Sequence, residues 1–576
     1  MAPARFVSRP STPHREFGPP GSQADASRQT HARVPFLVGL VICLAFAIAA
    51  CGEAADPDPA EMDPTAEHVH DAEAELGEVA FLTSCSDELQ PRIERGVALL
   101  HHMMYAQAAT VFEEVAAQEA DCAMAHWGLA MSNFQPFWGS ADIEAGREHA
   151  ERAVALEAPT DRERAHAAAA LAFFEDDGVS YAQRIRNWEA AMEELHEAFP
   201  DDREGAAFYA LAHLSVDPAS ADHQDRASAI LEGVYTEEPR HPGAIHYAIH
   251  VHDVERLADD GIEFARAYED IAPTIPHALH MPSHIYVRLG EWDEVIEWNR
   301  ASADAALLHP AGEYVSLHYP HALDYLMYGH LQKAEDDQAR AVLEELASED
   351  NFEPHLASGY ALAAVPARWY VERRDWVGAA ELEAGVPESF PWEDFPGAEA
   401  MTHFAKGLGA ARTGDVETAR AATERLTELE AASEAAEDYY WAQQIEVQRL
   451  SLVAWIDLAE GDADGAVQAM TAAAESAGEM EKHPITPGDL QPAYELLGDL
   501  LMEVDRPEEA LDAYRTSLEV WPERYHTLLG AARAANAAGM EEEARDFYTQ
   551  LATLTADADP EEREGIREAR ERAGSG

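Results

Sequence analysis

The histidines are the residues whose spacing in this chain most clearly indicates a chemical site. Eleven of the 27 histidines fall within residues 241–330. His246 and His250 have the i, i+4 spacing that puts two side chains on one face of a helix. His280 and His284 repeat that spacing 34 residues later. The pattern therefore predicts a cluster of imidazoles at one place in the fold.

Imidazole nitrogens beside one or two carboxylates suit Zn(II), Fe(II), Mn(II), Cu(II) or Ni(II). We assign the four histidines above as the first ligand candidates, with Asp253 and Asp324 as ligands or as groups that orient them. Two other interpretations stay open: the histidines hydrogen-bond one another, water or a peptide in a polar groove, or they are structural. The full predicted metal set is His246, His250, Asp253, His277, His280, His284, His321 and Asp324.

Several enzyme classes lack support in the sequence. There is no His-Glu-x-x-His, no P-loop and no Gly-x-Gly-x-x-Gly after a strand. A Gly-x-Ser-x-Gly elbow and a haem-attachment Cys-x-x-Cys-His are also missing. A zincin-type protease, a P-loop nucleotidase and a serine hydrolase of the elbow type are therefore not indicated.

Helices must position these residues. From residue 78 onward Ala, Leu, Glu and Arg recur with a helical period, and no convincing alternating run predicts a strand. Internal repeats are also visible, with two small residues 12 apart and an aromatic residue four positions further on. The copies are Gly96, Ala108 and Phe112, then Gly498, Ala510 and Tyr514, then Ala532, Ala544 and Tyr548.

Three prolines mark consecutive repeats around the histidines. Pro242, Pro276 and Pro320 are predicted to open the first helix of each repeat, where a proline costs no hydrogen bond. The last two copies read Pro-His-Ala-Leu-His and Pro-His-Ala-Leu-Asp. Pro282 lies inside the second of these helices, so we expect it to kink that helix or to start it late.

These spacings resemble the tetratricopeptide repeat (TPR) superfamily over most of residues 85–555. The resemblance implies an all-α fold, a right-handed superhelical solenoid of TPR-like helix-turn-helix repeats. In that family the face carrying the matched positions lines a concave groove, so the resemblance places the predicted metal set there. It also places Arg288 and Tyr328 in the groove as binding residues, although an ordinary surface arginine is an equal alternative for Arg288.

The N-terminal residues are predicted to be a processing signal. The apolar run 36–48 is too short to span a membrane and ends in Ile-Ala-Ala-Cys-Gly, which resembles the lipobox of bacterial lipoproteins. Residues 1–50 are thus expected to be a lipoprotein signal peptide, Cys51 the lipidated residue and 51–75 a flexible acidic tether. We expect an exported protein, lipid-anchored at the periplasmic or outer-membrane face of a bacterial membrane. An ordinary secretory signal cut near Ala50 is the alternative.

Two of the four cysteines remain for the folded part. Cys43 leaves with the signal and Cys51 carries the lipid. Cys85 and Cys122 flank one helical hairpin and are predicted to form a disulfide in an oxidising compartment. The alternative is two unpaired, buried cysteines.

Pro-rich breaks near residues 386–396 and 483–492 divide the mature chain. The predicted parts are a TPR-like solenoid with the histidine-rich groove (76–385), middle helical repeats (397–478), a C-terminal TPR pair (487–555) and a capping helix or tail (556–576).

The charge limits the partners. Asp and Glu number 109 against 40 Lys and Arg, a net charge of −69 that disfavours nucleic acid and anionic lipid. It suits a salty environment or the attraction of cations. The expected function is a membrane-anchored TPR-repeat protein that binds a peptide or protein partner in its groove and holds a divalent metal. The alternative is a metalloenzyme that activates water or oxygen on the same scaffold.

Overall fold

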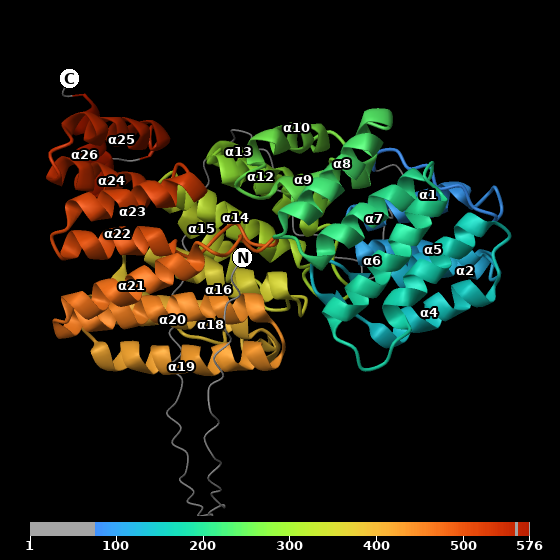
Figure 1. Cartoon of the computed structure of the whole chain (residues 1–576), viewed down its shortest axis with the longest axis horizontal. Coiled ribbons are helices and arrows are strands. Elements are labelled where there is room, and N and C mark those ends of the chain that lie inside the picture. The colour runs from blue at the N-terminus through green and yellow to red at the C-terminus, as the bar shows by residue number, and fades with distance from the viewer. Residues whose placement is uncertain (1–74, 559–562, 575–576) are drawn as a thin grey trace, which may run out of the picture. The chain divides into compact units, whose positions relative to one another are not determined.

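The computed structural model describes residues 75–558 and 563–574, which fold mainly into α-helices (Figure 1). The all-α prediction is confirmed. Strands in the described part of the chain are limited to one short hairpin, β1 (Phe134–Gln135) with β2 (Ser140–Ala141). The predicted signal peptide, the lipid site Cys51 and the tether up to residue 74 lie outside the described residues.

Consecutive helices along the chain pack against each other. The N-terminal helices are α1 (Gln90–His101), α2 (Tyr105–Gln118), α3 (Ala123–Ser132), α4 (Ile143–Ala155), α5 (Asp161–Phe174), α6 (Tyr181–Ala198), α7 (Arg203–Val216) and α8 (Ala221–Glu237). The middle helices are α9 (Pro242–His252), α10 (Ala258–Tyr268), α11 (Pro276–His280), α12 (Pro282–Leu289), α13 (Trp292–Ala306), α14 (His318–Gln332), α15 (Asp336–Leu346), α16 (Leu356–Val371) and α17 (Trp376–Ala380). The short 3-10 helix η1 (Trp392–Asp394) precedes α18 (Pro396–Thr413), α19 (Val416–Ala435), α20 (Tyr439–Glu460), α21 (Ala463–Ala477), α22 (Ala493–Glu503), α23 (Pro507–Val520), α24 (Tyr525–Ala537), α25 (Glu541–Leu554) and α26 (Glu564–Ala573).

Small residues bring these helices close together. A Cβ atom on Gly96 would lie 2.6 Å from the ring of Phe112, and one on Gly128 would lie 2.4 Å from the same ring. A Cβ on Gly498 would likewise lie 2.6 Å from the ring of Tyr514. The small and aromatic positions of the sequence repeat therefore contact one another directly, and a larger side chain at these glycines would separate the helices.

The prolines begin helices as predicted in two of three cases. Pro242 and Pro276 are the first residues of α9 and α11. The third helix, α14, begins at His318, two residues before Pro320. Pro282 starts α12, so the second copy of the helix is divided into α11 and α12.

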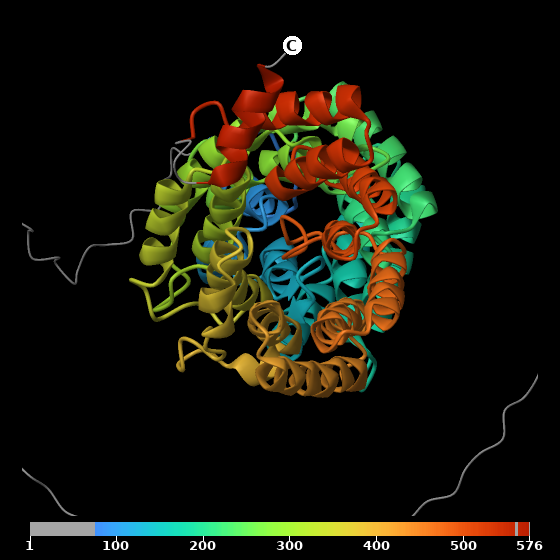
Figure 2. The ribbon, with the colours of Figure 1, turned by 90° about the vertical axis from the view of Figure 1, so that its left-hand side faces the viewer.

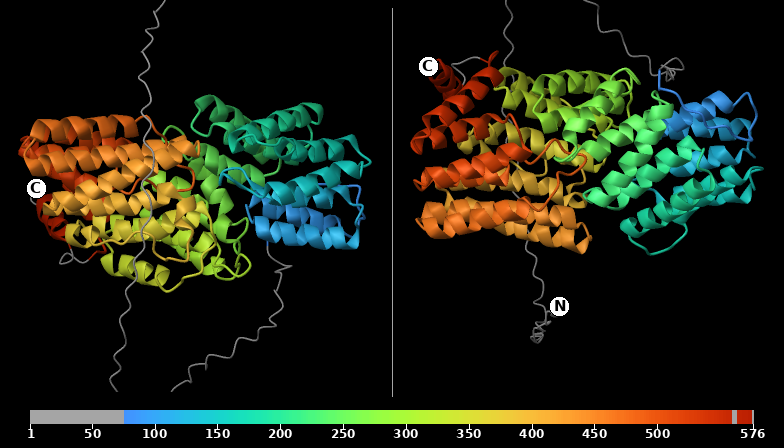
Figure 3. Two further views of the ribbon diagram at one scale, coloured as in Figure 1. Left: turned by 90° about the horizontal axis from the view of Figure 1, so that it is seen from below. Right: turned by 45° about the horizontal axis from the view of Figure 1, so that its top comes forward.

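The C-terminal helices return to the middle of the chain. Trp292 donates from Nε1 to the carbonyl of Glu523 at 2.8 Å, and Arg563 pairs with Asp336 at the start of α15. Figures 1 and 3 show α1–α8 at one end of this unit and α19–α26 at the other. In the end-on view of Figure 2, helices surround the segment 478–492, which joins α21 to α22.

Cys85 and Cys122 form the predicted disulfide. It ties the segment before α1 to the residue that precedes α3. As far as the chain is described, its helices include none with the length and apolar character needed to cross a membrane.

His102, at the end of α1, offers a test of the core by pH. Its ring is buried, with Nδ1 accepting from the Tyr268 hydroxyl at 2.6 Å and Nε2 donating to the carbonyl of Leu76 at 3.1 Å. Burial lowers the pKa of His102 to about 3, whereas a histidine in the unfolded chain titrates near 6.5. The native state therefore keeps His102 neutral, and its contribution to stability is present above pH 6.5 and lost as the pH falls.

We predict that His102→Gln destabilises the protein, and that this destabilisation shrinks by about 2 kcal/mol between about pH 7.5 and about pH 5, since only the wild type loses this contribution. Urea denaturation of both proteins at the two pH values measures the difference. An equal effect at both pH values would show that the pKa of His102 does not differ between the folded and the unfolded state.

Candidate metal centre

Helices α9, α11, α12 and α14 bring all six histidines of the predicted metal set together in two neighbouring groups. We name them trio A (His246, His250 and His277) and trio B (His280, His284 and His321). Within each trio, one ligand nitrogen from every histidine lies within 4.8 Å of the others. The two trios adjoin, with ring centroids of His250 and His284 5.5 Å apart and those of His277 and His280 6.0 Å apart.

The donor nitrogens of both trios lie in the interior rather than on an open groove. Five of the six side chains are buried, and both ring nitrogens of the sixth, His250, are buried as well. Burial lowers the pKa of every histidine in the trios, that of His280 to about 4. The imidazoles are therefore neutral near pH 7, which is the form that binds metal ions.

Hydrogen bonds fix the tautomers of two histidines in trio B. The Nδ1–H of His280 donates to Asn299 Oδ1 at 2.7 Å, because the amide nitrogen of Asn299 already donates to the carbonyl of Val295. The Nδ1–H of His284 donates to Asp253 Oδ2 at 2.9 Å. Each Nε2 therefore carries a lone pair, and the two Nε2 atoms face each other at 3.0 Å. Two lone pairs repel at this distance unless a cation lies between them.

A metal ion suits this arrangement better than a proton, because burial disfavours a charged imidazole. Two metal–nitrogen bonds of about 2.0–2.1 Å place their nitrogens roughly 3 Å apart. His321 supplies a third donor, since its Nε2 has no hydrogen-bond partner among the described residues. Trio B thus presents three neutral nitrogens to one point.

Trio A consists largely of nitrogens that lack hydrogen bonds. The Nδ1–H of His246 donates to the carbonyl of His101 at 2.5 Å, which leaves Nε2 as its lone-pair donor. Within the described ranges, that Nε2 and both ring nitrogens of His250 and His277 have no hydrogen-bond partner. Each buried polar group left unpaired costs about 1–3 kcal/mol. A metal ion bound by three of these atoms would remove most of that cost.

Asp253 lies behind trio B and orients it. Its Oδ2 accepts from His284 and, at 2.6 Å, from Lys482 Nζ, while its Oδ1 accepts from Arg288 Nε at 3.0 Å. Two cations therefore neutralise this carboxylate, and it belongs to neither trio. Its hydrogen bond to His284 supports the orienting role among the two predicted for Asp253, and that role stays a prediction. Arg288, expected to face a groove, is buried and holds Asp253.

Asp324 and Tyr328 lie on α14 but make other contacts. Asp324 Oδ1 accepts from Arg368 Nε at 2.9 Å, and burial raises the pKa of this carboxyl although Arg368 acts to lower it. The hydroxyl of Tyr328 accepts from Arg524 Nη1 at 2.6 Å. Both side chains are buried and both belong to ion-paired networks, so neither joins a trio.

Aromatic side chains from distant segments cover the trios. Phe137, in the β1–β2 turn, lies with its ring centroid 4.6 Å from that of His250. The neighbouring Trp138 ring contacts His277 and His321 at 5.7 and 5.8 Å. These contacts explain why the predicted groove positions are buried: the hairpin after α3 packs over them.

A third group of potential ligands lies around the carboxylate of Glu204. His101 Nε2 lies 2.6 Å from Glu204 Oε2, and His241 Nε2 lies 3.3 Å from Glu204 Oε1. Burial alone would lower the pKa of His241, but the charge of Glu204 raises it above its ordinary value. This group already contains a buried carboxylate, whereas neither trio does.

Sequence reasoning missed the residues that orient the trios. Asn299, Lys482 and the carbonyl of His101 come from other helices or from the 478–492 segment. Of these residues, only Lys482 could have been singled out in the sequence, because lysine is rare in this chain and occurs three times in all.

No protein-family model matches the chain, and no curated protein is significantly similar to it.

Proposed function

We propose that the protein binds late first-row transition metal ions, one in each histidine trio. The observation that carries this proposal is the pair of Nε2 lone pairs that face each other in trio B, His280 against His284, at 3.0 Å. All-nitrogen donor sets suit Zn, Cu, Ni or Fe and are poor ligands for Ca and Mg. The acidic surface of the protein also favours the approach of cations.

Burial of the donors supports a small ion over a peptide as the occupant of this centre. A peptide or protein partner elsewhere on the surface stays a prediction. A metalloenzyme that activates water or oxygen is the second candidate, because three protein ligands leave a coordination position for a small substrate. The close approach of the two trios favours the metalloenzyme, since two neighbouring ions can bind the same substrate.

We also infer that the helices form a right-handed TPR-like solenoid. Packing of consecutive helices and of alternate helices such as α14 with α16 supports this arrangement. The glycine–aromatic contacts at Phe112 and Tyr514 support it at the positions where the sequence repeat requires them. Export and lipid anchoring through Cys51 are part of the same proposal, and the Cys85–Cys122 disulfide supports an oxidising compartment.

Metal analysis of the full chain tests the proposal. The protein is purified without a histidine tag, loaded with Zn²⁺, dialysed extensively and analysed by plasma mass spectrometry. We expect about two ions per chain, one for each three-histidine site. Protein that retains no Zn²⁺, and that also takes up no Cu²⁺, Ni²⁺, Fe²⁺ or Mn²⁺, would leave the histidines with a structural role only.

A further inference from the structure

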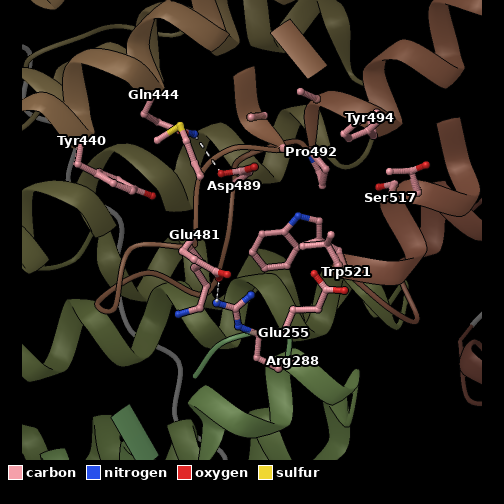
Figure 4. A pocket seen from close by; sticks show the side chains of 17 residues that line it. Glu255, Arg288, Tyr440, Gln444, Glu481, Asp489, Pro492, Tyr494, Ser517 and Trp521 are labelled. Carbon is pink, nitrogen blue, oxygen red and sulfur yellow. Dashed lines mark hydrogen bonds and ion pairs between the residues drawn. The ribbon is translucent and has the colours of Figure 1, made fainter. Parts of the chain in front are cut away.

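A cavity of about 110 Å³ lies beside the metal centre, between α20, α23 and the 478–492 segment. Figure 4 shows the side chains that line this cavity, with Asp489 and Trp521 near the centre of the view and Ser517 of α23 to one side. Arg288 is at its base, on the side of Asp253 and trio B. The space suits a small organic molecule better than a polymer.

The cations in the cavity wall already have partners. Arg288 donates to the carboxylate and the backbone carbonyl of Asp253, and it pairs with Glu481 at 3.6 Å. Lys482 donates to Asp253 and to the carbonyl of Thr486. The carboxylates of Asp253 and Glu481 therefore balance both positive charges, and an anionic ligand would gain little from either cation.

The carboxylate of Asp489 is in the opposite situation. In the described part of the chain, its only hydrogen bond comes from the neutral amide of Gln444, at 3.0 Å to Oδ1. Arg368 donates to the backbone carbonyl of Asp489 and not to the carboxylate. Burial raises the pKa of this carboxyl, although Gln444 and the charges of Arg368, Arg524 and Arg288 act to lower it. None of these three arginines donates a hydrogen bond to the carboxylate, so a cationic donor in the cavity would be its first direct charged partner.

Ser517 supplies a second polar atom without a partner. Its side chain is 1% exposed and lines the cavity, and its Oγ has no hydrogen-bond partner among the described residues. A serine inside a helix normally donates to the carbonyl four residues earlier, as Thr516 does here to Asp512. The Ser517 hydroxyl therefore has an unfilled hydrogen bond at the wall of the cavity.

Aromatic side chains complete the wall. Tyr440, Tyr494 and Trp521 line the same cavity, and Tyr440 and Trp521 are labelled on either side of Asp489 in Figure 4. Aromatic faces attract organic cations as well as alkyl groups. We propose that this cavity binds a small organic ammonium ion whose N–H groups donate to Asp489 and Ser517 and whose apolar part packs on the aromatic rings.

Isothermal titration calorimetry of the full chain with butylammonium chloride tests this site, with sodium butyrate and butanol as matched probes. We expect saturable one-to-one binding of butylammonium alone. Asp489→Asn should weaken it roughly tenfold or more, because the charge-assisted hydrogen bond is lost. Ser517→Ala should weaken it by a smaller factor. Glu460→Gln, which removes an exposed carboxylate on α20, should leave it unchanged.

Three results would overturn the proposal: no binding of butylammonium, equal binding of butyrate, or equal binding by the Asp489→Asn variant. Circular dichroism checks that each variant folds. If Asp489→Asn does not fold, the Ser517→Ala variant decides, and unchanged affinity there would exclude this cavity as the binding site.

Discussion

Replacing His321 by glutamine is expected to remove one of two bound metal ions and leave the other. Replacing His250 should remove the other ion, because each residue belongs to one trio only. The double variant should bind none. Each protein is loaded with Zn²⁺, dialysed and analysed for metal content under the conditions used for the wild type. Loss of a neutral nitrogen donor from a three-histidine site leaves too few protein ligands to hold the ion.

His252→Gln is the matched control. His252 lies on α9 beside trio A, but its Nδ1 donates to the carbonyl of Ala248 at 2.7 Å and it belongs to no trio. This variant should keep both ions. If His321→Gln or His250→Gln loses both ions, the trios form one shared site. If neither loses an ion, the histidines are not the ligands.

The two sites should differ in affinity. Trio B has two histidines held by Asn299 and Asp253, so its donors are oriented before the ion arrives. Only His246 is held in this way in trio A. Such supporting hydrogen bonds change metal affinity by about 10–100-fold. A chelator competition should therefore strip the ion of trio A first, and His250→Gln should leave the tighter site.

Local periodicity predicted that these histidines lie together, but as one cluster and not as two trios. An i, i+4 pair lies on one face of any helix, so His246 with His250 and His280 with His284 had to point the same way. The prolines at 242 and 276 aligned these two pairs in successive helices, and both begin a helix in the structure. The prediction depended on contacts within one helix and between adjacent repeats.

Contacts between distant segments could not be predicted in the same way. Trp138 and Lys482 contact the centre from segments that are more than a hundred residues away from the histidines in the sequence. No spacing rule connects them to the histidines. Because such side chains pack on the histidines, the positions that we expected to face an open groove are buried. Asp324 shows the same limit, since its partner Arg368 lies on α16 and draws it away from the histidines.

Arg524 is one of the side chains that join the C-terminal helices to the middle of the chain. Arg524 precedes α24 and is fully buried. It donates to Glu495 on α22 at 3.1 Å, to the Tyr328 hydroxyl on α14 at 2.6 Å and to Glu372 at the end of α16 at 2.7 Å. Both carboxylates are also buried, and Arg524 donates a hydrogen bond to each of them. The charge of Arg374 acts on Glu495 as well.

Arg524→Met should therefore destabilise the protein by about 3–5 kcal/mol, because it removes the cation that is hydrogen-bonded to two buried carboxylates. Urea denaturation followed by circular dichroism measures the effect. Adding Glu372→Gln and Glu495→Gln to this variant should restore much of the stability, since neutral side chains tolerate burial better than unpaired charges. Arg420→Met, which breaks an exposed pair with Glu460, should leave the urea midpoint unchanged. If the triple variant is less stable than Arg524→Met alone, the hydrogen bonds of the carboxylates, and not their charge, hold the C-terminal helices in place.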